Sequence, residues 1–270
     1  MAARPITFLS DYGLGDEFVG VVHGVIATIC PEARLIDLGH GVPRQDVQAG
    51  ALVLARALPY TPVGVHLAVV DPEVGARRRA VALRTVEDGR LLVGPDNGLL
   101  MPAAERFGGV AEVVEISASP WRLEPLSATF HGRDVFAPVA ARLACGAPLA
   151  SAGAPLEAGE LVTLEQTRPR QEEDSLVAHV VGTDTFGNAV LDATHADLLE
   201  RDLKLGDAFA ARTATRRVRG VVARTFSDAG AGGLIVYEDA GGALALAING
   251  GDAAALLGVR PGDEVRLEGA

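Results

Sequence analysis

The stretch from Thr129 to Pro138 reads "TFHGRDVFAP" and sets a histidine, a glycine, an arginine and an aspartate just before an apolar run. The apolar residues that follow recur at helical spacing, which predicts a helix with Asp134 as its N-cap and Gly146 at its end. His131 and Arg133 would then lie beside a helix N-terminus, where unpaired N–H groups favour anions and polar ligands. The alternative is that both side chains only tie this loop to its neighbours.

Four other short motifs carry carboxylates, arginines and amides: "SDYG" at 10–13, "VVDPEVGARRR" at 69–79, "TDTFGN" at 183–188 and "AINGGDAA" at 247–254. With His131 they form a set of carboxylates, arginines, one histidine and amides, several of them at strand ends. A carboxylate can accept a hydrogen bond or a proton, and a histidine can take a proton near neutral pH. Each motif also has a structural explanation, such as a turn cap at Asp71 or an Asx turn at Asp184.

Spacing argues against several other chemistries. The six histidines form no H-x-H or H-E-x-x-H pattern, so no metal site is predicted. The sequence has no G-x-S-x-G nucleophile elbow and no G-x-x-x-x-G-K-[ST] phosphate loop. Glycines 13, 15 and 20 miss the G-x-G-x-x-G spacing of dinucleotide-binding folds and are better explained by a turn and a close helix contact. We therefore expect no cofactor.

The first part of the chain alternates strand and helix patterns. Short β-rich runs occupy 5–9, 33–38, 63–70, 80–86, 90–94 and 110–116, and helical periods occupy 16–30, 47–58 and 100–107. This alternation predicts an α/β domain with a largely parallel sheet. Three polar motifs, at 10–13, 71–75 and 95–98, directly follow strands, where ligands bind in such sheets.

The second part has a different pattern. The segment "LEQTRPRQEED" at 164–174 is polar and charged without apolar periodicity, which predicts a linker at 165–175 between domains at 1–164 and 176–270. Afterwards, β-rich runs at 176–183, 207–213, 218–225, 233–239, 243–248 and 263–269 are separated by Gly and Asp turns. They predict a smaller all-β, barrel-like domain with one short helix at 252–257.

Composition limits the partners. The chain has 270 residues and a net charge of −11, which argues against a nucleic-acid partner, and we interpret the basic stretch 212–220 as a solvated strand face. The longest apolar candidate, 18–31, is too short to span a membrane, and no signal peptide is apparent. Cys30 and Cys145 each end a helical pattern and are interpreted as buried reduced thiols. We expect a cytoplasmic protein.

In this order, the motifs resemble those of the S-adenosylmethionine hydroxide adenosyltransferases, or S-adenosylmethionine hydrolases, which are relatives of fluorinating and chlorinating enzymes. The resemblance runs from about residue 5 to about residue 268. It implies hydrolysis of S-adenosylmethionine to adenosine and methionine by a water that attacks C5′. The same resemblance implies that Asp71, Arg78 and His131 surround this water.

The resemblance also assigns the substrate contacts. The implied positions are Asp11 for the ribose hydroxyls, Asp184 and Asn188 with the neighbouring Phe186 for the methionine end, and Asn249 in the segment that meets the adenine. Two positions depart from the family pattern, since Glu73 replaces a glycine and Ala240 replaces a commonly polar residue. Arg77 and Arg79 flank Arg78, so a shift by one residue would change which arginine reaches the water.

The implied reaction fits these residues. Displacement at C5′ releases a neutral thioether, so the leaving group needs no general acid, and the enzyme must instead deliver a desolvated oxygen nucleophile. No metal requirement is expected, because the sequence shows no set of metal ligands. Two rivals stay open: a halogenase acting on the same substrate, which the retained Asp71 and His131 disfavour, and a non-catalytic nucleoside sensor. The resemblance further implies a homotrimer with sites between the first domain of one subunit and the second domain of its neighbour. The alternative is a closed site within one monomer.

Overall fold

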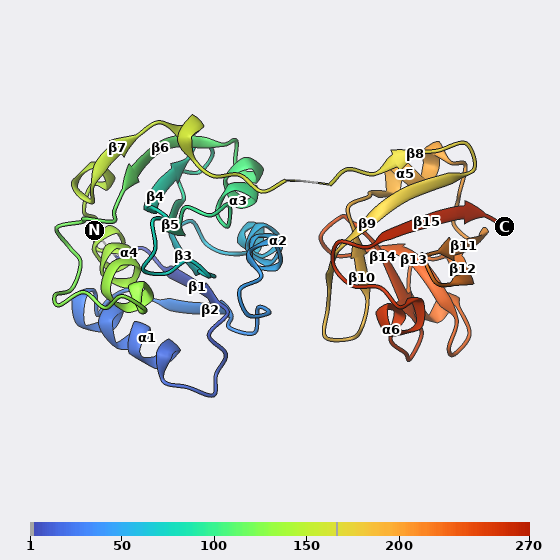
Figure 1. The fold of residues 1–270 in the computed structure, drawn as a ribbon, viewed down its shortest axis with the longest axis horizontal. Helices are drawn as coiled ribbons and strands as arrows, with labels where there is room; N and C mark the ends of the chain where they lie inside the picture. The colour runs from blue at the N-terminus through green and yellow to red at the C-terminus, as the bar shows by residue number, and fades with distance from the viewer. Residues whose placement is uncertain (1–2, 166) are drawn as a thin grey trace. The chain divides into compact units, whose positions relative to one another are not determined.

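The computed structural model describes residues 3–165 and 167–270, and the chain divides into two compact units, Met1–Leu164 and Glu165–Ala270 (Figure 1). Residue 166, inside the expected linker 165–175, lies outside the described residues. Strand β8 (Arg170–Gln171) pairs with β9 (Ser175–Thr183). The part of the expected linker at 170–175 therefore belongs to the second unit. Its polar sequence did not indicate a strand, but backbone pairing at a short edge strand does not require apolar side chains.

The first unit is built on a seven-stranded sheet in the order β2-β1-β3-β5-β4-β6-β7. Its strands are β1 (Ile6–Ser10), β2 (Leu35–Gly39), β3 (Val65–Val69), β4 (Ala80–Thr85), β5 (Leu91–Pro95), β6 (Val110–Glu115) and β7 (Ala154–Leu156). The order from β2 to β5 is parallel, as predicted, whereas β4, β6 and β7 extend it antiparallel. A tight turn with positive φ at Asp88 and Gly89 joins β4 to β5, and such a short connection permits only antiparallel pairing.

Helices cover both faces of this sheet (Figure 1). They are α1 (Phe18–Ile29), α2 (Val47–Ala57), α3 (Met101–Arg106) and α4 (Ala137–Ala144), at or near the predicted positions. Alternation along β1 explains the two layers, because Phe8 packs into the core under α1 and α4 while Leu9 packs into the core under α2 and α3. The carboxyl ends of the parallel strands thus point to one edge of the sheet.

The start of α4 differs from the prediction. Gly132–Phe136 forms a wide helical turn that runs straight into α4, so Asp134 lies inside the helical segment and is not its N-cap. The Asp134 carboxylate instead accepts hydrogen bonds from the backbone N–H of Ser127 at 2.8 Å and from Nε of Arg133 at 2.6 Å. Asp134 is used to fix the preceding loop, which is why it is not available to cap the helix.

The two cysteines also differ from the prediction. Cys30 and Cys145 form a disulfide bond, not two reduced thiols. Each cysteine directly follows a helix, and α1 and α4 pack side by side, which brings the two Cα atoms to 5.9 Å. The pairing depends on this tertiary contact between segments 115 residues apart in the chain, so periodicity alone could not indicate it.

The second unit is a closed β-barrel with β8 at its edge, which confirms the predicted all-β class. Besides β8 and β9 its strands are β10 (Ala189–Leu191), β11 (Ala208–Arg212), β12 (Arg217–Val222), β13 (Leu234–Glu238), β14 (Leu244–Ile248) and β15 (Glu264–Gly269). Pairing of β10 with both β14 and β9 closes the ring. The helices are α5 (His195–Glu200), which was not predicted, and α6 (Ala253–Leu257).

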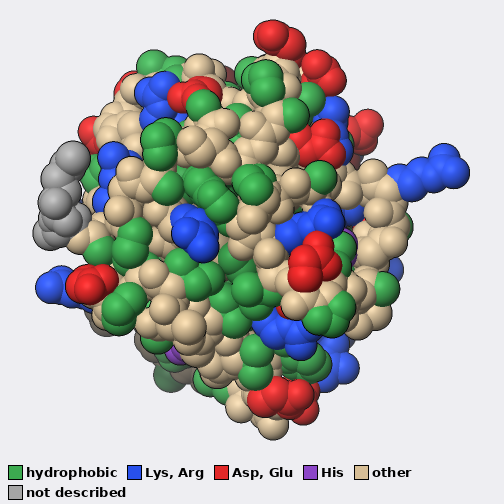
Figure 2. All heavy atoms as spheres, turned by 90° about the vertical axis from the view of Figure 1, so that its left-hand side faces the viewer, with side chains coloured by type: hydrophobic (Ala, Val, Ile, Leu, Met, Phe, Trp, Pro, Cys, Tyr) green, Lys and Arg blue, Asp and Glu red, His purple; other side chains and the backbone are tan. Residues whose placement is uncertain are grey.

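Surface charge agrees with the composition. Arg217 and Arg219 of the basic stretch are exposed on β12, and Arg217 contacts Glu268 of β15, as a solvated strand face would. On the face drawn in Figure 2, acidic and basic side chains are interspersed among apolar ones and do not gather into a basic stripe. Within residues 3–165 and 167–270, no helix is both long enough and apolar enough to cross a membrane.

Candidate active site

Three predicted site residues are in direct contact in the first unit. The Arg78 guanidinium donates two hydrogen bonds to the Asp71 carboxylate, from Nε to Oδ1 at 2.8 Å and from Nη2 to Oδ2. The same Nη2 donates to Nδ1 of His131 at 2.9 Å. The side chains of Asp71 and Arg78 are 5% and 4% exposed, so they form a buried ion pair. Each Asp71 oxygen keeps a lone pair that can accept a hydrogen bond from water.

A close backbone approach brings these residues together. Asp71 lies just beyond the end of β3, and Gly75 in the same loop has φ of +78°. A Cβ at Gly75 would lie 2.1 Å from the carbonyl oxygen of Ala128, in the loop that leads to His131. Only glycine fits this position, so the "DPEVG" and "TFHGRD" loops can touch and Arg78 can reach His131.

The structure distinguishes the three neighbouring arginines. Arg78 contacts both Asp71 and His131, whereas Nε of Arg79 donates to Asp96 at 2.8 Å and its Nη2 donates to the carbonyl of Glu160. Arg77 is exposed. Arg79 directly precedes β4, whereas Arg77 lies in the bend before it.

The tautomer of His131 follows from its partner. Since an arginine can only donate, Nδ1 of His131 must accept, and the neutral ring carries its proton on Nε2. Burial, together with the nearby Arg78 charge, lowers the pKa of His131, although Asp71 and Asp134 oppose this shift. His131 is therefore a neutral ring that offers an N–H donor from Nε2.

Tyr12 is a site residue that the sequence analysis missed. Burial and the charges of Asp11 and Asp71 raise its pKa, while the charge of Arg78 lowers it. A Cβ at Gly132 would lie 2.1 Å from the Tyr12 hydroxyl oxygen, so this glycine is needed for the tyrosine to pack there. The available signal was its place in "SDYG", next to Asp11.

Asp11 lies at the same edge of the sheet, directly after β1. Its Oδ2 accepts a hydrogen bond from the backbone N–H of Gln45 at 2.8 Å, and Gln45 adopts a positive φ of 64°. This bond joins the loop after β1 to the loop after β2. The carboxylate is held at the rim of the sheet, beside Tyr12.

The second unit gathers its predicted residues around a cavity of about 620 Å³ lined by Asp184, Phe186, Asn188, Phe226, Tyr237, Ile248, Gly250 and Gly251. Oδ1 of Asp184 accepts from the backbone N–H groups of Phe186 and Asn188, both at 2.9 Å, and Oδ2 accepts from Nδ2 of Asn188 at 2.7 Å. This is the Asx-type turn that the sequence offered as an alternative, and it leaves the Phe186 side chain 78% exposed. Asp184 thus shapes the wall of the cavity.

Asn249 is placed differently from the other predicted contacts. Its Nδ2 donates to the carbonyl of Ala229 at 2.8 Å and so fastens the loop beside the cavity, whose lining includes the neighbours of Asn249. Phe226 and Tyr237 were not predicted from the sequence, and their rings lie 5.2 Å apart in the lining. The two rings are tilted by 60° to each other and give the cavity an aromatic wall.

Comparison with known proteins agrees with the two-unit architecture. The family model of the SAM hydroxide adenosyltransferase N-terminal domain matches residues 6–153, and that of the C-terminal domain matches residues 178–266. The chain belongs to the SAM hydroxide adenosyltransferase family. It is 53% identical over 270 residues to a protein of Salinispora arenicola named "(R)-S-adenosyl-L-methionine hydrolase", covering 99% of each chain. A protein of Nocardia brasiliensis named "Fluorinase" is 29% identical over 297 residues, covering 98% of this chain and 97% of the relative.

A solved structure shares the fold. A protein of Thermotoga maritima described as an uncharacterized conserved protein superposes with a TM-score of 0.90 at 38% identity, covering 97% of this chain and 99% of the other.

The structure accounts for Glu73, which departs from the hydroxide adenosyltransferase pattern. Glu73 is exposed, and its backbone carbonyl accepts from Ala76 in the turn that precedes Arg78, so the turn tolerates this residue.

Proposed function

We propose that this protein hydrolyses S-adenosyl-L-methionine to adenosine and L-methionine. The observation that carries the proposal is the buried contact of Asp71, Arg78 and His131, which combines a hydrogen-bond acceptor and a donor for one water molecule. Relatives over the full length that are named for this activity support it.

In the proposed mechanism Asp71 is the base. A water held between an Asp71 oxygen and the Nε2–H of His131 gives one proton to Asp71 as its oxygen attacks C5′. The O–C5′ bond forms, the C5′–S bond breaks, and the sulfonium takes the electron pair to leave as neutral methionine thioether. Arg78 holds both partners in place. This assignment revises the role expected for His131, since Nδ1 faces Arg78 and cannot receive a proton without losing that contact.

Product analysis tests the proposal. We expect purified protein incubated with S-adenosylmethionine in chloride or fluoride buffer to release adenosine and methionine in equal amounts. A 5′-halo-5′-deoxyadenosine as the main product would support the halogenase instead, and tight binding without turnover would support a nucleoside sensor. Because the relatives' name specifies the (R) form, we further propose that only this sulfonium epimer is consumed from an epimeric mixture.

We propose that the protein acts as a homotrimer in which one subunit's first unit and a neighbour's second unit share each site. The predicted residues support this arrangement because they fall in different units: Asp11, Asp71, Arg78 and His131 in the first and Asp184, Phe186, Asn188 and Asn249 in the second. Mixing inactive Asp71→Asn chains with inactive Asp184→Ala chains should restore part of the activity once subunits exchange. Proven exchange without recovery, or an active monomer, would contradict shared sites.

We propose that hydrolysis needs no metal and no cofactor, because the leaving group is neutral and Asp71 with His131 supplies the proton transfer and orientation. Turnover after dialysis against a chelator should be unchanged. The cytoplasmic location stays a prediction, and the Cys30–Cys145 bond removes the reduced-thiol argument for it. Cell fractionation with an antibody against the protein would test it.

A further inference from the structure

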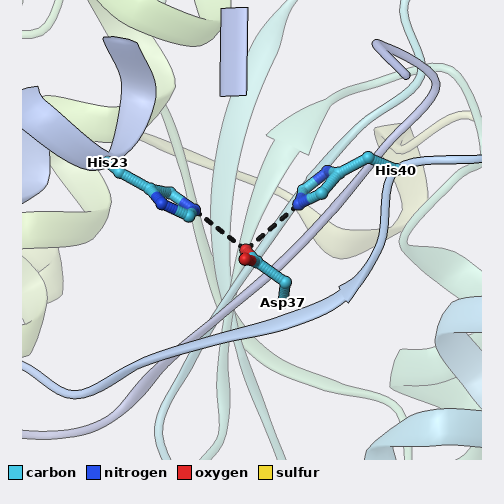
Figure 3. Close-up of side chains that lie close together, drawn as sticks. All are labelled: His23, Asp37 and His40. Atoms are coloured by element: carbon cyan, nitrogen blue, oxygen red, sulfur yellow. Dashed lines mark hydrogen bonds and ion pairs between the residues drawn. The ribbon is translucent and has the colours of Figure 1, made fainter. Parts of the chain in front are cut away.

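Two histidines and an aspartate lie close together at the edge of the first unit's sheet that is formed by β2. They are separate from the Asp71–Arg78 ion pair. Figure 3 shows His23 from α1 and His40 from the loop after β2 both pointing at the Asp37 carboxylate on β2. Nε2 of His23 lies 2.9 Å and Nε2 of His40 lies 3.1 Å from the same oxygen, Oδ1. All three donor atoms fall within 4.8 Å of one another.

The His40 side chain is 3% exposed, and its two ring nitrogens have unequal surroundings. Nδ1 lies 2.8 Å from the Ser10 hydroxyl, a well-formed hydrogen bond. Nε2 is buried and makes no hydrogen bond of acceptable geometry with any described residue, despite the short distance to Asp37. A buried ring nitrogen without a hydrogen bond calls for an explanation. Here the lone pair of Nε2 could bind an ion that lies between this nitrogen and the Asp37 carboxylate.

We propose that His23, Asp37 and His40 bind a Zn²⁺ ion. Imidazole nitrogen and carboxylate oxygen are preferred zinc ligands, and three protein ligands with an open fourth position form a common coordination set. Zinc–ligand bonds of about 2.0–2.1 Å place tetrahedral donors about 3.3 Å apart, close to the contacts with Asp37. The side chains of His23 and Asp37 are partly exposed, which leaves room for a water as the fourth ligand.

The surroundings of His40 match those of a zinc ligand. Metal-bound histidines usually engage their second nitrogen in a hydrogen bond that fixes the ring, and Ser10 supplies this contact to Nδ1. The backbone carbonyl of His40 also accepts from the N–H of Gly13 at 2.7 Å, and the N–H of Tyr12 donates to the Ser10 hydroxyl at 3.3 Å. These contacts hold His40 against the turn at 10–13 whether or not an ion is bound.

Binding is measured on untagged, chelator-treated, non-reduced protein by calorimetric titration with Zn²⁺, and with Co²⁺ as a probe whose visible absorption reports its geometry. Non-reducing buffer matters because Cys30, Glu32 and Cys145 form a second donor cluster whose thiols are occupied by the disulfide. We expect one Zn²⁺ per chain, a rise in Tm with Zn²⁺, and a tetrahedral Co²⁺ spectrum.

Variants identify the site. Changing even an outer partner of a metal ligand lowers affinity by about 10–100-fold, so His23→Gln and Asp37→Asn should each weaken binding by about 100-fold or more, and Ser10→Ala by about 10-fold or more. His179→Gln is the matched control, because His179 contacts Asp192 at 2.9 Å in the second unit without a second histidine. It should leave the affinity unchanged.

His23 and Asp37 are partly exposed, so their variants should fold without metal, and unchanged Tm in chelator verifies this. Three results would overturn the proposal. They are no saturable Zn²⁺ binding by the unaltered protein, equal affinity in the folded His23→Gln and Asp37→Asn variants, and binding that is lost in Cys145→Ser alone. If the unaltered protein shows no saturable Zn²⁺ binding, His23, Asp37 and His40 form only a hydrogen-bonded cluster.

Discussion

The Asp71–Arg78 ion pair makes the sharpest test of the site, because the first unit contains a matched second pair. Asp71→Asn keeps the shape and one hydrogen-bond acceptor but leaves the Arg78 charge without its counter-ion at 4% exposure. Removing one partner of a buried pair costs about 3–5 kcal/mol, and we expect the low end since the amide oxygen still accepts one bond. Loss of the base should lower kcat by at least about 10²-fold.

The control is Asp96→Asn. Asp96 is also a buried aspartate paired with an arginine, but its partner Arg79 is 29% exposed and faces Glu160 instead of His131. We expect about 1–3 kcal/mol of destabilisation there, since solvent screens part of the lost attraction. Turnover should stay near that of the unaltered protein, because Asp96 touches none of the three site residues.

Two assays separate the effects. Trp121 is the only tryptophan and lies in the first unit, so its fluorescence during denaturant unfolding reports the stability of that unit. Adenosine release measures turnover below the unfolding range. The reasoning is refuted if Asp71→Asn retains activity, or if Asp96→Asn loses as much activity as Asp71→Asn at equal stability.

Three further predictions concern the same unit. Burial and Arg78 lower the pKa of His131 from its usual 6.5, so kcat/KM should stay level as pH falls through 6.5 and decline only below it; a decline centred above 6.5 would contradict this. Burial lowers the pKa of His66 to about 3, so below pH 6.5 the unfolded chain binds a proton that the folded chain does not, and stability should fall by about 2 kcal/mol from pH 7 to 5. His66→Gln should remove that share of the slope, and an unchanged slope would refute the assignment. Gly132→Ala should cost about 1–3 kcal/mol through the clash with the Tyr12 hydroxyl, and adding Tyr12→Phe should recover most of it; lack of recovery would place the clash elsewhere.

Local patterns explain why the elements were predictable. Each of the six strand runs in the first part and the six in the second became a strand, because alternation and β-rich composition are set by neighbours in the chain. What failed depended on contacts that hydrophobic periodicity does not reveal. The Cys30–Cys145 bond forms only because α1 packs beside α4. The Asp134 carboxylate accepts a hydrogen bond from the backbone N–H of Ser127 instead of capping the helix.

The grouping of the candidate residues was predictable to a similar extent. Matching motifs named Asp71, Arg78 and His131, but the residues did not reveal that Arg78 alone among three arginines would contact both others. Tyr12 was hidden because nothing in "SDYG" distinguishes a packing tyrosine from one beside the ion pair. The His23, Asp37 and His40 cluster escaped the search for metal motifs, since its members come from a helix, a strand and a loop.

The pairing of charges in this site bears directly on the chemistry proposed. A sulfonium substrate loses its positive charge as C5′–S breaks, so an unpaired carboxylate nearby would stabilise the ground state more than the transition state. Arg78 neutralises Asp71 in a buried two-point contact, which leaves lone pairs for a water without a net negative field. Asp71→Asn therefore does two things at once: it removes the base, and it leaves a buried positive charge facing a cationic substrate. Its effect should appear in KM as well as kcat, whereas loss of a base alone would lower kcat only.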